Sequence, residues 1–163
     1  IVLVIGKTEG HIDQSLFARN ILDEKNGPPP EINLFNEKNN GETLLKLIDH
    51  GLIQCAHDVS LGGIITAVSK MCIKANKGIQ LNKPRYLISE IEYLFAEDQG
   101  RYIVEINPNE LKKVTDILKN NAVHFDELGT INKDQLIINE KTKVTIDELK
   151  TSNTNWLTNY MSK

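Results

Sequence analysis

The residues with the clearest capacity for chemistry lie in the stretch 56–63, which reads AHDVSLGG. His57 and Asp58 form a polar pair, and an aspartate can orient an imidazole or hold a magnesium ion. Gly62 and Gly63 follow, and glycines let a backbone approach a ligand closely. Backbone amides and a carboxylate in such a turn can meet an anionic ligand or its metal ion. The stretch therefore predicts a ligand site.

A strand and a helix must position this turn. Residues 52–56 are apolar enough for a short buried strand, and residues 64–73 repeat apolar side chains with the period of a helix. A purely structural interpretation also stands, in which Asp58 accepts backbone amides and caps the helix. The glycines would then only let the helix pack against a sheet. Ser60 belongs to the turn in either case.

A second polar segment lies at residues 93–101, which read YLFAEDQGR and lead into the alternating run YIVEI at 102–106. The alternation predicts a strand. Glu97, Asp98 and Gln99 are either polar contacts that face the same site or a solvated acidic loop. Arg101 can pair with Glu97 or Asp98 and fix the turn.

These two segments, in this order, resemble the C-terminal module of the aminoimidazole ribonucleotide (AIR) synthetase superfamily. The resemblance is closest to formylglycinamide ribonucleotide amidotransferases, or phosphoribosylformylglycinamidine synthases, which carry segments such as AHDVSDGG and LFSESQGR. Residues 5–15, IGKTEGHIDQS, resemble the LGETKEELGGS of that family. The resemblance implies an AIR synthase-like C-terminal domain of the α/β (α+β) class, with helices packed on a mixed sheet. Residues 1–163 are expected to form one such domain, cut from a longer multidomain enzyme.

The resemblance also implies an activity for the whole enzyme. Such an enzyme is an ATP-dependent C–N ligase of purine biosynthesis that uses ATP and magnesium to convert formylglycinamide ribonucleotide into formylglycinamidine ribonucleotide. It implies upstream ATP-binding modules in the same chain, a glutaminase subunit or domain that supplies ammonia, and a cytoplasmic location. It assigns no catalytic residue to this segment and leaves open whether the segment itself holds a cofactor or a metal ion. The isolated domain is expected to fold without turnover, because it holds neither a glycine-rich ATP loop with a lysine nor a glutaminase nucleophile.

Three departures from the family pattern weaken the prediction of a phosphate site. Leu61 stands where the family often has aspartate, and Asp98 stands where serine is common and adds a charge that repels phosphate. Asp13 and Gln14 replace a glycine pair and remove backbone freedom. The departures favour an auxiliary or structural cleft, and the candidate cleft or ligand-binding residues are His57, Asp58, Ser60, Gly62, Gly63, Glu97, Asp98, Gln99 and Arg101.

Two other classes of function stay open. One is another superfamily enzyme, such as aminoimidazole ribonucleotide synthetase, selenophosphate synthetase or a hydrogenase-maturation dehydratase. The other is a non-catalytic interaction domain that supports a complex. The sequence upstream of Ile1 separates them, because a synthetase carries an ATP-binding module there.

Composition excludes several classes. The net charge of -3 offers no basic face for nucleic acid, and no apolar run reaches transmembrane length. Cys55 and Cys72 lie in apolar segments and are predicted to be core thiols of a reducing compartment.

Periodicity and helix breakers predict the remaining elements. A helix over 14–22 precedes a rigid GPPP corner, and a second helix, interrupted near Gly41, ends near Gly51 with its apolar residues on one face. Ser89 is predicted to cap a helix over 90–95, and Pro108 to open one to about Lys119. A loop surrounds Pro84. Strands are expected near 1–5, 78–81, 125–131, 136–138 and 144–146, and a last helix from Asp147.

Overall fold

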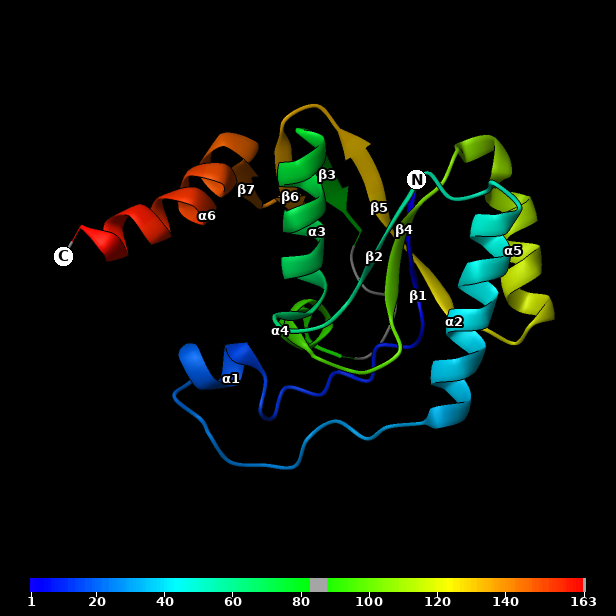
Figure 1. Ribbon diagram of the computed structural model, residues 1–163, viewed down its shortest axis with the longest axis horizontal. Coiled ribbons are helices and arrows are strands. Elements are labelled where there is room, and N and C mark those ends of the chain that lie inside the picture. The colour runs from blue at the N-terminus through cyan, green and yellow to red at the C-terminus, as the bar shows by residue number, and fades with distance from the viewer. Residues whose placement is uncertain (83–87, 163) are drawn as a thin grey trace.

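The chain folds around one seven-stranded mixed sheet with helices on both faces (Figure 1). The computed structural model describes residues 1–82 and 88–162, so the loop predicted around Pro84 lies outside the described residues. The strand order is β2-β4-β1-β5-β3-β6-β7. β3 and β6 run parallel, whereas the other neighbouring pairs are antiparallel. The strands are β1 (Val2–Ile5), β2 (Cys55–Asp58), β3 (Gly78–Leu81), β4 (Tyr102–Glu105), β5 (Phe125–Asn132), β6 (Gln135–Ile138) and β7 (Thr142–Thr145). The mixed sheet confirms the predicted fold class.

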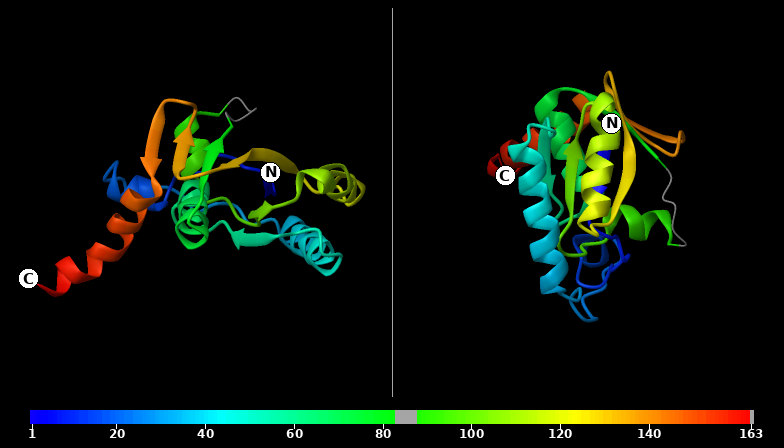
Figure 2. Two further views of the ribbon diagram at one scale, coloured as in Figure 1. Left: turned by 90° about the horizontal axis from the view of Figure 1, so that it is seen from above. Right: turned by 90° about the vertical axis from the view of Figure 1, so that its right-hand side faces the viewer.

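Helices cover the two faces unequally. α2 and α5 pack on one face, while α3 and α4 lie on the other and α6 extends away from the body (Figures 1 and 2). The helices are α1 (Leu16–Asn20), α2 (Leu34–Asp49), α3 (Gly63–Ala75), α4 (Glu90–Phe95), α5 (Leu111–Asn120) and α6 (Ile146–Met161). A single 3₁₀ turn, Pro108–Glu110, leads into α5, where the proline was predicted to open a helix.

The central strand β1 explains how the two layers share one sheet. Side chains alternate between the faces of a strand, and all four residues of β1 are buried. Val2 and Val4 join the core under α3, whereas Leu3 and Ile5 join the core under α2 and α5. A strand that is apolar at every position therefore ends up in the middle of the sheet, between two cores.

Local signals account for several helices. Ser89 caps α4, as predicted, and Glu92 completes a capping box with it; Thr145 forms the same motif with Glu148 at the start of α6. α3 buries Ile64 and Val68 on the predicted apolar face. α6 begins at Ile146, so the strand predicted over 144–146 ends one residue earlier, at Thr145.

Other predictions are wrong in detail. α2 continues through Gly41 without interruption, and only Leu44 and Leu47 of its apolar residues are buried. Leu45 and Ile48 are exposed, because a step of 100° per residue turns them away from the sheet. α1 is shorter than predicted, since Gln14 has a positive φ of 63° and Ser15 caps the helix behind it.

The strand that precedes the AHDVSLGG turn also differs from its prediction. β2 begins at Cys55 and lies at an edge of the sheet, where β4 is its one strand partner among the described residues, and it is mostly exposed. Cys55 is therefore exposed and not a core thiol, whereas Cys72 is buried as predicted. Burial raises the pKa of the Cys72 thiol to about 11. In the part of the chain that the structure describes, no helix is long and apolar enough to cross a membrane.

The packing of α2 yields a direct test. Leu47→Ala removes a fully buried side chain and is expected to lower the free energy of unfolding by about 2–5 kcal/mol. Leu45→Ala, in the same helix but 59% exposed, is expected to change it by less than about 1 kcal/mol. Urea unfolding of both variants measures the difference. Equal losses would contradict the observed orientation of α2.

Candidate functional site

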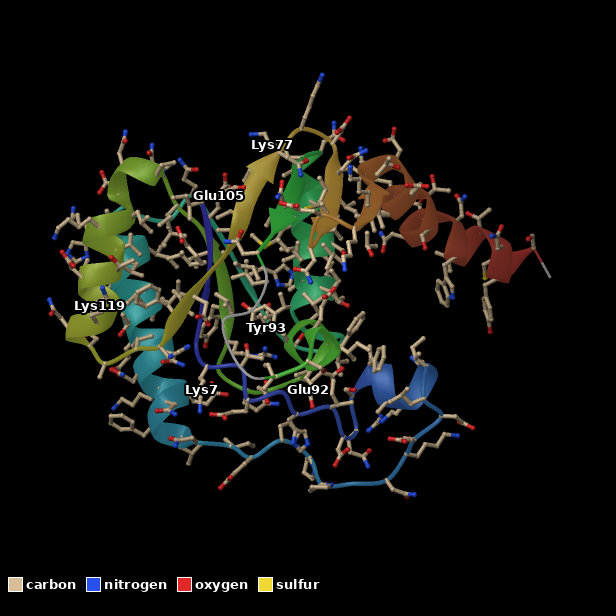
Figure 3. The ribbon with its side chains drawn as sticks, turned by 180° about the vertical axis from the view of Figure 1, so that it is seen from behind. Lys7, Lys77, Glu92, Tyr93, Glu105 and Lys119 are labelled. Atoms are coloured by element: carbon tan, nitrogen blue, oxygen red, sulfur yellow. The ribbon has the colours of Figure 1, made fainter. Side chains whose placement is uncertain are left out.

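The pairing of β2 with β4 brings the two polar segments together. Asp58, the last residue of β2, lies opposite Tyr102, the first residue of β4. One step further, the Val59 amide donates to the Arg101 carbonyl at 2.9 Å. The AHDVSLGG turn and the AEDQGR turn therefore leave the same end of the sheet side by side. Figure 3 shows Lys7 and Glu92 toward this end, with Lys77 and Glu105 toward the other.

Glu97 ties the start of two helices together. Its Oε1 accepts the Gly62 amide at 2.7 Å and the Leu16 amide at 2.8 Å. These amides belong to the N-terminal ends of α3 and α1, whose first N–H groups have no partner within the helix. A carboxylate is favourable there because it also meets the positive end of each helix dipole. Glu97 thus contacts the backbone of the glycine turn.

Asp98 holds the loop that follows β1. Its carboxylate accepts the amides of Glu9, Gly10 and His11 at 3.0–3.1 Å. The residue is only 6% exposed, so the interpretation of Asp98 as part of a solvated acidic loop is wrong. Its negative charge, predicted to repel phosphate, is already engaged by three amides of its own chain.

Arg101 is buried next to Asp98 and binds the backbone of the same turn. The side chain is 1% exposed, and its guanidinium donates to the carbonyls of Ala96 and Asp98 and to Thr8 Oγ1 at 2.7–3.1 Å. Nη1 lies 3.8 Å from Asp98 Oδ2, which confirms the predicted pairing with Asp98. Burial lowers the pKa of the guanidinium, and the charge of Asp98 opposes that shift. We call Glu97, Asp98 and Arg101 together the acidic–arginine clamp.

The glycine turn packs tightly against the end of α4. Gly63 has a φ of 69°, and a Cβ placed on it would lie 2.6 Å from the Leu94 carbonyl oxygen and 2.7 Å from that of Ala96. Gly62, with a φ of 84°, is the N-cap of α3 and forms no side-chain cap bond. The prediction that Asp58 caps this helix is therefore wrong. Gly63 thus has a packing role, but its close neighbour is the end of α4 and not the sheet that the packing interpretation names.

His57 and Asp58 are the accessible members of the site. His57 Nδ1 lies 3.3 Å from Asp58 Oδ1, and the Asp58 side chain is 67% exposed. Tyr102 lies across from Asp58, and burial raises the pKa of its phenol, to which the charges of Glu37 and Asp58 add. Asp58 therefore presents carboxylate oxygens to the outside of this end of the sheet.

The two remaining candidates have lesser roles. Gln99 Nε2 makes a long contact, 3.4 Å, with the Glu97 carbonyl, and the residue borders an open polar groove together with Lys7, His11 and Asn36. Ser60 contributes its carbonyl, which accepts the Gly63 amide at 3.0 Å and closes the turn.

Sequence reasoning missed partners that have no sequence signature. Thr8 is buried, and it meets Arg101 only because β1 and β4 are neighbours in space. Gly6 allows the Gly100 carbonyl to approach, since a Cβ there would lie 2.5 Å from that oxygen. Gln14 keeps its positive φ with a side chain that donates to the Lys25 and Gly27 carbonyls. The similarity of residues 5–15 to the family was the one available signal.

No group of three or more His, Cys, Asp or Glu residues suited to a metal ion occurs within residues 1–82 and 88–162. Magnesium usually takes one or two carboxylates together with substrate phosphates and water. Glu97 and Asp98 already accept backbone amides, so Asp58 is the carboxylate of the two turns that fits such a role.

Comparisons with known proteins agree with this architecture. A sequence model of the family described as "AIR synthase related protein, C-terminal domain" matches residues 1–139. The chain belongs to this family. Its AIR synthase-related domain therefore covers the whole sheet except β7, while α6 lies beyond the matched residues.

Two curated relatives cover nearly the whole chain. The phosphoribosylformylglycinamidine synthase subunit PurL of Pelagibacter ubique is 71% identical over 161 residues, which are 99% of this chain and 22% of that relative. The corresponding subunit of Bartonella bacilliformis is 35% identical over the same shares. The chain thus spans about a fifth of the length of the curated relatives it matches.

A solved structure shares the fold. The structure of T. maritima PurL complexed with FGAR superposes with a TM-score of 0.76 at 21% identity, over 91% of this chain and 27% of that one. At that identity the similarity establishes the AIR synthase-related fold alone.

Substitutions at two glycines separate close packing from backbone strain. Gly51→Ala places a side chain at a φ of 66° with nothing within 4 Å, so it is expected to cost about 1–2 kcal/mol. Gly63→Ala has a similar φ but also meets backbone oxygens, so it is expected to cost at least about 3 kcal/mol. Chemical denaturation of the two variants measures both losses. Equal losses would show that α3 does not pack closely on the end of α4.

Proposed function

We propose that this chain is the AIR synthase-related C-terminal module of a PurL-type phosphoribosylformylglycinamidine synthase. The observation that carries the proposal is the 71% identity to PurL of Pelagibacter ubique over 99% of the chain. Residues 1–163 form a single module in this proposal, and the rest of the enzyme lies in other parts of the polypeptide. The whole enzyme converts formylglycinamide ribonucleotide into formylglycinamidine ribonucleotide with ATP.

The chemistry assigned to the whole enzyme draws on the solved PurL structures. T. maritima PurL has been described in complexes with FGAR and with ATP. For this chain we propose the same two ligands, bound mainly by other modules, because its clamp residues already hold its own backbone. Asp58 is then the residue through which this module faces the ligands, directly or through a magnesium ion.

Ammonia is proposed to come from a glutaminase. A PurLQS assembly is known from Thermotoga maritima, which supports a PurL protein that works with further subunits. The two cysteines of this chain suit no nucleophile role, because Cys72 is buried and the pKa of both thiols is raised. A cytoplasmic location, as for a purine biosynthetic enzyme, completes the proposal.

Turnover tests the assignment. The full-length polypeptide that contains this chain is expected to form the amidine from formylglycinamide ribonucleotide, ATP, magnesium and ammonia. Residues 1–163 alone are expected to give no product above background, because they hold no ATP loop. Product is measured by chromatography. A full-length protein that is inactive with ammonia, or a fragment that turns over, would overturn the proposal.

Asp58 separates a ligand contact from a structural residue. Asp58→Ala is expected to change the free energy of unfolding by less than about 0.5 kcal/mol, since its side chain is exposed and caps no helix. The same change is expected to lower kcat/KM of the full-length enzyme by at least about tenfold.

Two variants control this measurement. Asp49→Ala removes an exposed carboxylate outside both turns and is expected to leave kcat/KM unchanged. Asp58→Asn keeps the side-chain shape without the charge and is expected to behave like Asp58→Ala. Unchanged kcat/KM in both Asp58 variants would remove Asp58 from the ligand site.

A further inference from the structure

The C-terminal half of α6 exposes large apolar side chains to solvent. Four large apolar side chains are exposed there: Trp156 (65%), Leu157 (56%), Tyr160 (66%) and Met161 (75%). Residues 151–161 contain no charged side chain, because the charges of the helix, Asp147, Glu148 and Lys150, all lie in its first turns. Aromatic residues and methionine without charges are the composition of an interface core.

These side chains form an ordered stripe. Trp156 and Tyr160 are one turn apart and stack with ring centroids 5.7 Å apart and planes inclined by 11°. Leu157 and Met161 repeat the same spacing beside them, which is the anchor pattern of a helix that docks into a groove. Trp and Tyr also supply much of the binding energy at interfaces.

The two halves of α6 differ in what supports them. Ile146 is 3% exposed and Leu149 packs against the core under α3, so the first turns belong to the domain. Beyond them the helix extends away from the body (Figures 1 and 2). An open groove between α3 and α6 leads from Ile65 and Ile73 to Trp156. The helix therefore holds its stripe away from the domain, next to a partly apolar groove.

We propose that residues 151–161 dock this module onto a part of the same full-length polypeptide that lies outside residues 1–163. This inference rests on the proposed function, because it takes the chain as part of a PurL-type protein. The curated relatives match α6 together with the domain and are far longer, since the chain covers 22% of each. The receiving surface is an uncharged apolar groove that accepts the aromatic pair.

A tethered partner fits this stripe better than a second copy. A stable interface between free proteins involves about 20–30 residues a side, which a stripe of four side chains does not approach. A segment of the same chain is present at an effective concentration of the order of millimolar, so a small apolar contact is enough to hold it. The absence of charge in residues 151–161 also offers no electrostatic steering for a partner that arrives by diffusion.

Amide hydrogen exchange of the full-length protein tests the docking. The peptide that contains residues 151–161 is expected to be protected in the wild type. It is expected to exchange at least about tenfold faster in Trp156→Ala/Tyr160→Ala, which removes both anchors. Alanine is the better helix former, so propensity alone would slow the exchange, and faster exchange reports lost docking. The peptide over 63–75 in α3 is expected to stay unchanged.

The matched control is Thr151→Ala/Thr158→Ala, which changes two exposed residues of the same helix on the side away from Trp156 and is expected to keep the protection. Rapid exchange of 151–161 in the wild type would overturn the inference. Protection that falls on dilution, with a change in mass by light scattering, would assign the surface to a second copy and also overturn it. Amidine formation is measured in parallel, so an active enzyme without docking refutes only this inference, and docking without turnover refutes only the proposed function.

Discussion

The charged side chains of Glu97, Asp98 and Arg101, of which Asp98 and Arg101 are buried, make the interactions on which this end of the domain depends. Residues 6–15 and 59–62 lie outside the strands and helices, so no ladder or helix supplies partners for their amides. Apart from bonds within their own turns, these amides need hydrogen-bond acceptors from other segments. A buried amide without a partner costs about 1–3 kcal/mol. Asp98 accepts the amides of residues 9–11, and Glu97 accepts those of Gly62 and of Leu16 at the start of α1. Arg101 donates to two carbonyls of the segment that carries both carboxylates. The turn over residues 96–101 thus holds both the loop after β1 and the glycine turn before α3 in place.

This arrangement divides the polar residues into two roles. Asp98 and Arg101 are buried and occupied, so they position backbone and are poorly placed to exchange partners with a ligand. His57 and Asp58 are the last residues of an edge strand whose one strand partner within residues 1–82 and 88–162 is β4, and the Asp58 carboxylate is exposed. Among the carboxylates of the two turns, Asp58 is therefore the one left available to a ligand or a neighbouring module. The clamp keeps Asp58 in place because the strand that pairs with β2 begins at Tyr102, directly after Arg101.

The domain as a whole also separates residues that are buried within it from residues that remain exposed, and four of the large exposed apolar side chains lie on α6. The sheet and the helices on it enclose two apolar cores, whereas the end of α6 carries large apolar side chains that the domain leaves uncovered. A module with a well-packed core and an exposed apolar stripe is suited to a larger protein, where other parts of the polypeptide cover the stripe. The proposed PurL assignment and the proposed docking helix agree on this point.

The sequence by itself determined the local features. The alternation in YIVEI, the capping serine Ser89 and the apolar period of residues 64–73 predicted β4, α4 and α3, because each depends on neighbours within a few residues. The order of the two polar segments indicated the family. It also placed the candidate residues on two turns, which the structure then brought to one end of the sheet.

Only the tertiary structure decided which of those residues are free. Whether a strand is central or at an edge depends on its partners, so the apolar run before Ala56 was predicted as buried although β2 lies at the edge. Likewise, nothing within a few residues of Asp98 reveals that it meets the amides of residues 9–11, because that contact spans nearly ninety positions of the chain. Leu45 and Leu47 are equally apolar in the sequence, and only the packing of α2 on the sheet exposes one and buries the other. Long-range contacts fix these outcomes, and sequence patterns report local geometry.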